Sequence, residues 1–195
     1  MLSSHFHGQK VLPAIRKMKD LEHLMSSSFT TLVLLDSHIA QLASIGQLVR
    51  KHRKQLLVHV DLINGLKNDD YAIEFVCQTM RPAGIISTRS SAVMTAKKHK
   101  ILGIQRHFLL DSTALEMTYK LSDKIKPDFI EVMPGIMPHI IAEMRKRIDI
   151  PILAGGLIRT PGDVDLALAS GAVAVTSSLK ELWNAFADET PKAQD

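Results

Sequence analysis

Short runs of hydrophobic residues alternate with amphipathic stretches along the whole chain. Several runs are apolar at nearly every position, as Leu32-Val33-Leu34-Leu35 and Ile130-Glu131-Val132-Met133 show. This pattern is typical of parallel strands that are covered on both faces of the sheet. About eight runs qualify as strands. They are Val11–Ile15, Thr30–Asp36, Gln55–Leu62, Ala83–Thr88, Gly103–Leu110, Phe129–Met133, Pro151–Ala154 and Ala172–Thr176.

The stretches between these runs have the spacing of helices. Met117, Leu121 and Ile125 recur every four residues and would form one buried stripe. Thr160, followed by a proline and by Asp163 three positions later, is typical of a helix start. A Ser-Gly pair then marks the end of that helix. The chain therefore reads as a repeated strand-helix unit.

Eight such units predict a compact (β/α)8 barrel of the TIM type, because closing the sheet removes its exposed edges. The chain has 195 residues, which is near the lower end of about 200 for such barrels, so its loops should be minimal. A doubly wound open sheet is the alternative, since the first run is weak. We expect one barrel domain over residues 1–187 and a polar C-terminal tail over 188–195.

Composition indicates which partners and which cellular compartment suit this domain. The chain is 46% hydrophobic and 23% charged, which suits one buried core, and its net charge of +4 permits an anionic partner. Cys77 is the only cysteine, so no intrachain disulfide can form. No apolar segment approaches the roughly 18 residues that a membrane span needs. These features favour a cytoplasmic protein that does not insert in a membrane.

Two turns rich in glycine and hydroxyl groups are the strongest chemical signal. The seventh run ends in Ala154-Gly155-Gly156-Leu157 and the eighth ends in Thr176-Ser177-Ser178. These turns are neighbours in a barrel, and the loops after strands seven and eight commonly hold a phosphate. Glycines let the backbone approach an anion, and a helix starting near Ser178 would direct free N–H groups at it. We therefore expect Gly155, Gly156, Leu157, Ser177 and Ser178 to bind a phosphate, although a tight turn and a helix cap would give the same motifs.

Polar residues also gather at the predicted carboxyl ends of other strands, namely Asp36, His59, Asp61, Asp111 and Glu131. Ionised carboxylates accept hydrogen bonds from hydroxyl groups, so they would suit a polyol attached to the phosphate. His59 and Asp61 are two residues apart, which would place them on one strand face. Asp36 and Asp111 would also serve as helix N-caps. A metal site at His59 and Asp61 has too few ligands to be predicted.

Arg106 is a charge inside an otherwise apolar run. Burying it without a partner would be costly, so we expect it to meet Glu131, Asp111 or the ligand. Two further residues are candidates to face the pocket or its rim. They are Arg89, just after the fourth run, and Lys67, in the loop that follows the third run.

Five segments in order along the chain carry a resemblance to a known family. They are HVDLINGL (59–66), GIIST (84–88), QRHFLLDS (105–112), EVMPG (131–135) and AGGLI (154–158). Together they resemble the glycerol uptake operon antiterminator regulatory proteins. The resemblance implies a barrel that binds glycerol 3-phosphate, with no cofactor, metal or catalytic residue. Such a protein acts on the leader of a nascent messenger RNA and prevents premature termination upstream of glycerol-catabolism genes.

The resemblance also implies roles by position. The phosphate would be held by the two glycines and two serines of the last turns, and Pro134 and Gly135 would shape the neighbouring turn. The glycerol end would be surrounded by His59, Asp61, Asp111 and Glu131, with Arg106 and Asp36 beside them.

Three basic clusters are the candidates for contact with RNA, because each adds attraction for phosphates. All lie near predicted helix ends, where cations also favour the helix dipole, so solvated helix ends are the competing interpretation. The aromatic content of 5% argues against a platform for stacking bases. The clusters are Arg50-Lys51-His52-Arg53-Lys54, Lys97-Lys98-His99-Lys100 and Arg145-Lys146-Arg147. A ligand promotes RNA binding only if it binds the RNA-competent state of the protein more tightly than the idle state. Flexible strand-end loops or the interface of a homo-oligomer would allow these two states.

Two other functions fit the same residues. One is a barrel enzyme acting on a triose or sugar phosphate, such as an isomerase, aldolase or phosphodiesterase, although no lysine is clearly placed at a strand end for a Schiff base. The other is a scaffolding barrel with a vestigial phosphate site, which predicts no specific ligand.

Overall fold

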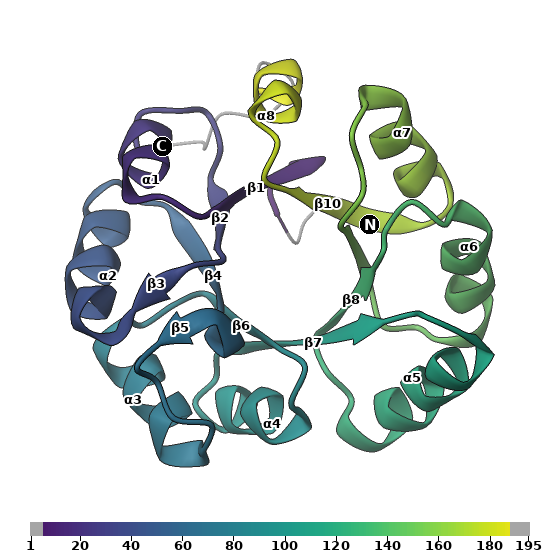
Figure 1. Cartoon of the computed structure of the whole chain (residues 1–195), viewed down its shortest axis with the longest axis horizontal. Coiled ribbons are helices and arrows are strands. Elements are labelled where there is room, and N and C mark those ends of the chain that lie inside the picture. The colour runs from purple at the N-terminus through teal and green to yellow at the C-terminus, as the bar shows by residue number, and fades with distance from the viewer. Residues whose placement is uncertain (1–5, 188–195) are drawn as a thin grey trace.

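The computed structural model describes residues 6–187, and at its centre eight parallel strands form a closed barrel (Figure 1). Because the first strand pairs with both the second and the last, the (β/α)8 prediction is confirmed and the open-sheet alternative is wrong. Around the barrel the strands are β1 (Val11–Ile15), β2 (Thr31–Leu34), β4 (Gln55–His59), β6 (Gly84–Ser87), β7 (Leu102–Phe108), β8 (Phe129–Met133), β9 (Ile152–Gly155) and β10 (Ala172–Ser177).

Helices surround the barrel, and one follows each of its strands (Figure 1). They are α1 (Met18–Leu24), α2 (Leu42–Lys51), α3 (Asp70–Thr79), α4 (Ser90–Lys98), α5 (Ser112–Ile125), α6 (Pro138–Arg147), α7 (Pro161–Ala169) and α8 (Lys180–Phe186). A small two-stranded sheet of β3 (Ser37–His38) and β5 (Ile63–Asn64) joins the loops after β2 and β4. We call the end of the barrel at the carboxyl ends of the strands the upper face, and the opposite end, where the helices terminate, the lower face.

The strands are buried on both of their faces, as the continuous apolar runs predict. One cluster of apolar side chains fills the barrel, and a larger one lies between the strands and the helices. Phe6 packs on Phe129, the first residue of β8, with ring centroids 5.0 Å apart. Because side chains fill the barrel interior, it is a packed core and not a pore, and ligand access is confined to its faces.

The helix signals around Thr160 are confirmed. Thr160 and Asp163 form a reciprocal capping box at the start of α7, and Gly171 after its end has a φ of +106°. No helix in residues 6–187 is long and apolar enough to cross a membrane. The tail predicted over 188–195 lies outside the described residues.

One strand boundary matters for the site. The run predicted as a strand over 55–62 ends at His59, because Val60–Leu62 turns into a short 3-10 helix. Side chains alternate by two only along extended backbone. The expectation that His59 and Asp61 share one strand face is therefore wrong.

Candidate functional site

A cavity of about 250 Å³ opens at the upper face beside the ends of β1, β9 and β10. Its lining includes Gly156 and Leu157 from the turn after β9, and Ser177 and Ser178 from the end of β10. The two turns singled out in the sequence therefore do meet in one cavity. Gly155 lies directly beneath this lining as the last residue of β9.

The glycines of the β9 turn leave no room for side chains. A Cβ on Gly155 would lie 2.6 Å from Thr176 Oγ1 and 3.0 Å from Glu131 Oε1. Gly156 has a φ of +76°, a conformation that L-residues adopt only with strain. Both glycines are thus required by the local structure, whether or not an anion is bound.

The turn after β8 supports the β9 turn from behind. The Met133–Pro134 peptide bond is cis, and the N–H of Gly135 donates to the carbonyl oxygens of Gly155 at 2.6 Å and Gly156 at 3.1 Å. A Cβ on Gly135 would lie 2.7 Å from the nitrogen of Gly155. Pro134 and Gly135 therefore set the position of the predicted phosphate turn without lining the cavity.

Two backbone donors at the cavity are unused. Within residues 6–187, the N–H groups of Leu157 and Ser178 donate to no protein acceptor. The carbonyl of Ser177 instead accepts a hydrogen bond of 2.7 Å from Trp183 Nε1, and its hydroxyl accepts one of 3.3 Å from Leu179 N–H. The chain thus holds the β10 turn in place while leaving donors at the cavity wall.

Three arginines line the same cavity. Arg16 follows β1, Arg159 precedes α7, and Arg106 projects from β7. Arg16 and Arg159 are exposed and take part in no ion pair among the described residues. Sequence reasoning missed both because they belong to no motif. Their only signal is their position, each within a few residues of a predicted strand end.

Arg106 is anchored in the barrel by a buried ion pair. Its Nε lies 2.6 Å from Glu131 Oε2, and the two side chains are 8% and 0% exposed. The other carboxylate oxygen of Glu131 accepts a hydrogen bond of 2.7 Å from Thr176 Oγ1. The predicted pairing of Arg106 with a carboxylate is confirmed. Glu131 itself does not line the cavity, so it acts on the site through Arg106 and Thr176.

His59 lies at the end of β4 and is 3% exposed. Neither of its ring nitrogens has a hydrogen-bond partner within the described residues. Burial, and then the positive charge of Arg106, lower the pKa of His59 to about 4. The ring is therefore neutral near pH 7, and it lies outside the lining of the cavity.

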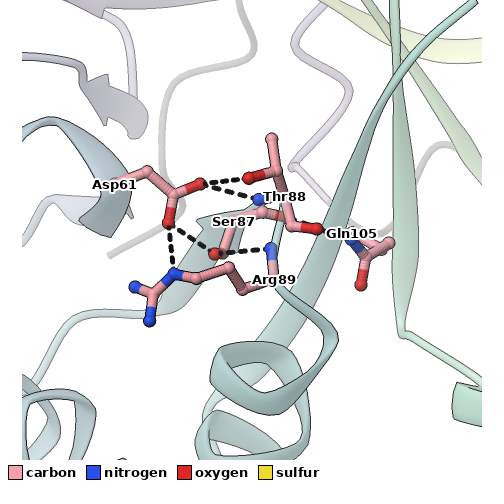
Figure 2. Close-up of polar contacts among 5 residues, drawn as sticks. All are labelled: Asp61, Ser87, Thr88, Arg89 and Gln105. Atoms are coloured by element: carbon pink, nitrogen blue, oxygen red, sulfur yellow. Dashed lines mark hydrogen bonds and ion pairs between the residues drawn. The ribbon is translucent and has the colours of Figure 1, made fainter. Parts of the chain in front are cut away.

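Asp61 is held by the loop after β6 (Figure 2). One carboxylate oxygen accepts from Ser87 Oγ at 2.6 Å and Arg89 Nε at 3.2 Å, and the other accepts from the N–H and hydroxyl of Thr88 at 2.7 and 2.9 Å. Burial raises the pKa of Asp61, but the hydrogen bonds from Ser87 and Thr88 outweigh it and hold the pKa below its ordinary value. Gln105 Nε2 donates to the carbonyl of Thr88 at 2.8 Å and so fixes the same loop (Figure 2).

A second cavity, of about 270 Å³, adjoins the first and shares Arg16, Leu35 and Leu62 with it. Its polar lining is Asp36, Asp61 and Asn64. Asn64 Nδ2 donates to Asp36 Oδ1 at 3.3 Å. Asp36 caps no helix, so the N-cap interpretation of that residue is wrong.

Three predicted residues lie elsewhere. Asp111 is the N-cap of α5 and accepts from the N–H of Ala114 at 2.8 Å, so the cap interpretation is confirmed. It lines neither cavity, and its contact with the ligand stays a prediction. Arg89 is turned toward Asp61 (Figure 2). Lys67 is an exposed loop residue outside both linings. In residues 6–187, no group of three histidine, cysteine or acidic side chains is arranged to hold a metal ion.

The three basic clusters lie at the lower face, at the ends of α2, α4 and α6. Some of their side chains are engaged in the fold. Arg50, Lys54 and Arg145 donate to backbone carbonyls, Lys97 pairs with Asp128, and Arg147 pairs with Glu116. The remaining candidates, Lys51, Arg53, Lys98, Lys100 and Lys146, are exposed.

Several known proteins are similar to this chain over most of its length. The structure of the glycerol uptake operon antiterminator regulatory protein from Listeria monocytogenes str. 4b F2365 has 46% sequence identity and a TM-score of 0.89, covering 92% of this chain and 97% of that one. A glycerol uptake operon antiterminator-related protein from Thermotoga maritima MSB8 has 27% identity and a TM-score of 0.80, covering 90% and 98%.

Sequence comparisons agree with the structural ones. The uncharacterized protein YgcP of Escherichia coli (strain K12) is 28% identical over 173 residues, which cover 89% of this chain and 91% of that protein. The model of the glycerol-3-phosphate responsive antiterminator family matches residues 11–183. The chain therefore belongs to the glycerol-3-phosphate responsive antiterminator family.

Proposed function

We propose that this protein binds glycerol 3-phosphate at its upper face and, in response, acts as an antiterminator on the leader messenger RNA of glycerol-catabolism genes. Family membership supports the regulatory class. The observation that carries the choice of ligand is the cavity in which unused backbone N–H groups and three arginines meet.

The phosphate belongs in the cavity between the β9 and β10 turns. The free N–H groups of Leu157 and Ser178 offer donors of the kind that bind phosphates in strand-helix turns. Arg16 and Arg159 form no ion pair among the described residues, so their guanidinium groups are available to an anion, although the Asp163 carboxylate lies near enough to Arg159 to be influenced by its charge. Hydrogen bonds from charged donors to phosphate are about twice as strong as neutral ones.

The glycerol portion belongs toward the adjoining cavity. Asp36, Asp61 and Asn64 line it. The side-chain oxygens of Asp36 and Asn64 can accept hydrogen bonds from hydroxyl groups, whereas the oxygens of Asp61 already accept four hydrogen bonds from the end of β6 and the loop after it. Carboxylates repel a phosphate but suit a polyol. Arg16 lines both cavities, whereas Arg106 and Arg159 line only the first and the two carboxylates line only the second, which favours one orientation of the ligand.

Calorimetry with glycerol 3-phosphate, glycerol and inorganic phosphate tests the ligand. We expect glycerol 3-phosphate to bind most tightly, because only it uses both cavities. Arg159→Gln should weaken binding of glycerol 3-phosphate by about tenfold, the equivalent of one charged hydrogen bond. Lys120→Gln, an exposed change on α5, is the matched control and should leave binding unchanged. Equal or absent binding of all three compounds would refute the proposal.

Gel-shift assays with leader RNA, with and without glycerol 3-phosphate, test the regulatory half. We expect the ligand to tighten RNA binding, and RNA binding that ignores the ligand would remove the switch. Incubation with phosphorylated trioses and sugars, followed by mass spectrometry, addresses a barrel enzyme. No lysine lines either upper cavity among the described residues, so Schiff-base chemistry has no support there. Turnover of any of these compounds would nevertheless overturn the proposal.

A further inference from the structure

The lower face carries exposed cations on four adjoining connections of the barrel. These connections lead from α2, α3, α4 and α5 into β4, β6, β7 and β8, which are consecutive neighbours in the sheet. The cations are Lys51, Arg53, Arg81, Lys98, Lys100 and Lys126, and all six are exposed. We call them the cationic arc.

Four members of the arc occupy left-handed backbone positions. Arg53, Arg81, Lys100 and Lys126 come just after their helices and have φ values of 54°, 53°, 59° and 48°. Glycine is the residue that usually takes this position, because an L-residue is strained there. The chain therefore carries a long cationic side chain at each of four places where local structure favours glycine.

Stabilisation of helix dipoles accounts for only part of the arc. Lys51 and Lys98 lie in the last turns of α2 and α4 and satisfy this need, but the other four members follow the helices. The connections after α1 and α7 carry no lysine or arginine and consist of Met25–Thr30 and Ser170–Gly171. The end of α6, next to the arc, is also basic, so cations gather at the ends of α2 to α6 and are not spread over all helix ends.

Acidic residues do not neutralise the arc. Segments 50–55, 80–83 and 97–102 contain no aspartate or glutamate. Asp128 borders the arc near Lys126, but it is engaged by Lys97 Nζ at 3.3 Å and by the N–H of Gly103 at 2.8 Å. No member of the arc forms an ion pair within residues 6–187. Arg81 of the arc also lines a small cavity of about 140 Å³, together with Arg50 and Lys54.

We infer that the cationic arc is the surface on which the phosphate backbone of RNA docks, on the face opposite the ligand cavity. This inference rests on the proposed function for the choice of RNA among polyanions. Packed helices lie about 8–10 Å apart, so four adjoining helix ends span about 25–30 Å, enough to follow several successive phosphates. Segments 50–55, 80–83, 97–102 and 126–128, which carry the arc, contain no phenylalanine, tyrosine or tryptophan, so contact is made through charge and not through stacking of bases.

The test uses glycine substitutions that relieve backbone strain while removing charge. The variant Arg53→Gly/Arg81→Gly/Lys100→Gly should fold at least as well as the wild type, which thermal unfolding will verify. The matched control, Lys19→Gln/Lys67→Gln/Lys120→Gln, removes three exposed positive charges outside the arc. Binding is followed by fluorescence anisotropy of a labelled 30-nucleotide RNA of mixed sequence, over about 50–200 mM salt.

We expect the arc variant to lose at least tenfold in RNA affinity, and its slope of log affinity against log salt to become shallower by about two. The control variant should stay within twofold of the wild type. Equal losses in both variants would overturn the inference, as would failure of the wild type to bind the RNA. Binding of labelled polyglutamate or anionic phospholipid vesicles as tight as that of RNA, with the same loss in the arc variant, would replace RNA with a general polyanion.

Calorimetry with glycerol 3-phosphate on the same samples separates this inference from the proposed function. Unchanged ligand binding in an arc variant that has lost RNA supports both. Normal ligand binding without RNA binding by the wild type refutes the arc and keeps the ligand site. RNA binding through the arc without any binding of glycerol 3-phosphate keeps the arc and refutes the proposed ligand.

Discussion

Replacing Glu131 with glutamine tests how the floor of the ligand cavity is held together. The substitution keeps the shape of the side chain and an oxygen that can accept from Thr176. It removes the negative charge 2.6 Å from Arg106 Nε and leaves a guanidinium that is 8% exposed without its carboxylate. Breaking a buried pair by removing one partner costs about 3–5 kcal/mol. For a domain of this size the midpoint of thermal unfolding should fall by about 6–20 °C.

The assay is urea or thermal unfolding of the Glu131→Gln variant beside a control at an exposed pair. Glu116 and Arg147 are also joined by a contact of 2.7 Å, but their side chains are 52% and 51% exposed. Water screens that pair, so Glu116→Gln should change stability little. Added inorganic phosphate should raise the midpoint of Glu131→Gln more than that of the wild type, because Arg106 then lacks an internal anion. Similar losses of stability in the two variants would refute the argument from burial.

Three further predictions follow from local geometry. Gly156→Ala places a side chain at a φ of +76°, with its Cβ 2.8 Å from Met133 Cε. Calorimetry should therefore show at least about tenfold weaker binding of glycerol 3-phosphate. Unchanged affinity would contradict the role of this turn in ligand binding. Burial is the main cause that lowers the pKa values of His59 and His107 to about 4. The unfolded state therefore binds more protons between pH 6.5 and 4, and the free energy of unfolding falls as the pH drops through this window. Urea unfolding of His107→Phe should show a smaller fall than the wild type, and an identical pH profile would count against burial as the cause. Thr160→Ala removes the side-chain acceptor of the α7 capping box. The free energy of unfolding measured in urea should fall by about 1 kcal/mol, while ligand binding stays unchanged. Weaker ligand binding would show that the cap also positions Arg159.

Much of the fold follows from local patterns in the chain. Runs buried on both faces, separated by helical spacing, are enough to predict parallel strands with helices between them, and the capping signals at Thr160 and Gly171 act within a few residues. The Gly155-Gly156 and Ser177-Ser178 turns could be recognised because their chemistry resides in adjacent residues. Their meeting in one cavity was predictable only after the barrel was assumed, since closure makes the last two strands neighbours.

Other parts of the site depended on the tertiary structure. A turn of 3-10 helix after His59 directs Asp61 to the end of β6 and the loop after it, and the alternation of residues along the chain does not predict this change. Arg16 and Arg159 belong to no motif, and they become cavity residues only because β1 closes against β10. The ends of α2 to α5 lie on the face opposite the ligand cavity because each helix returns the chain from one parallel strand to the start of the next. Hydrophobic periodicity is a property of neighbouring residues, whereas the direction of a loop side chain and the face on which a charge lies are decided by contacts between distant segments.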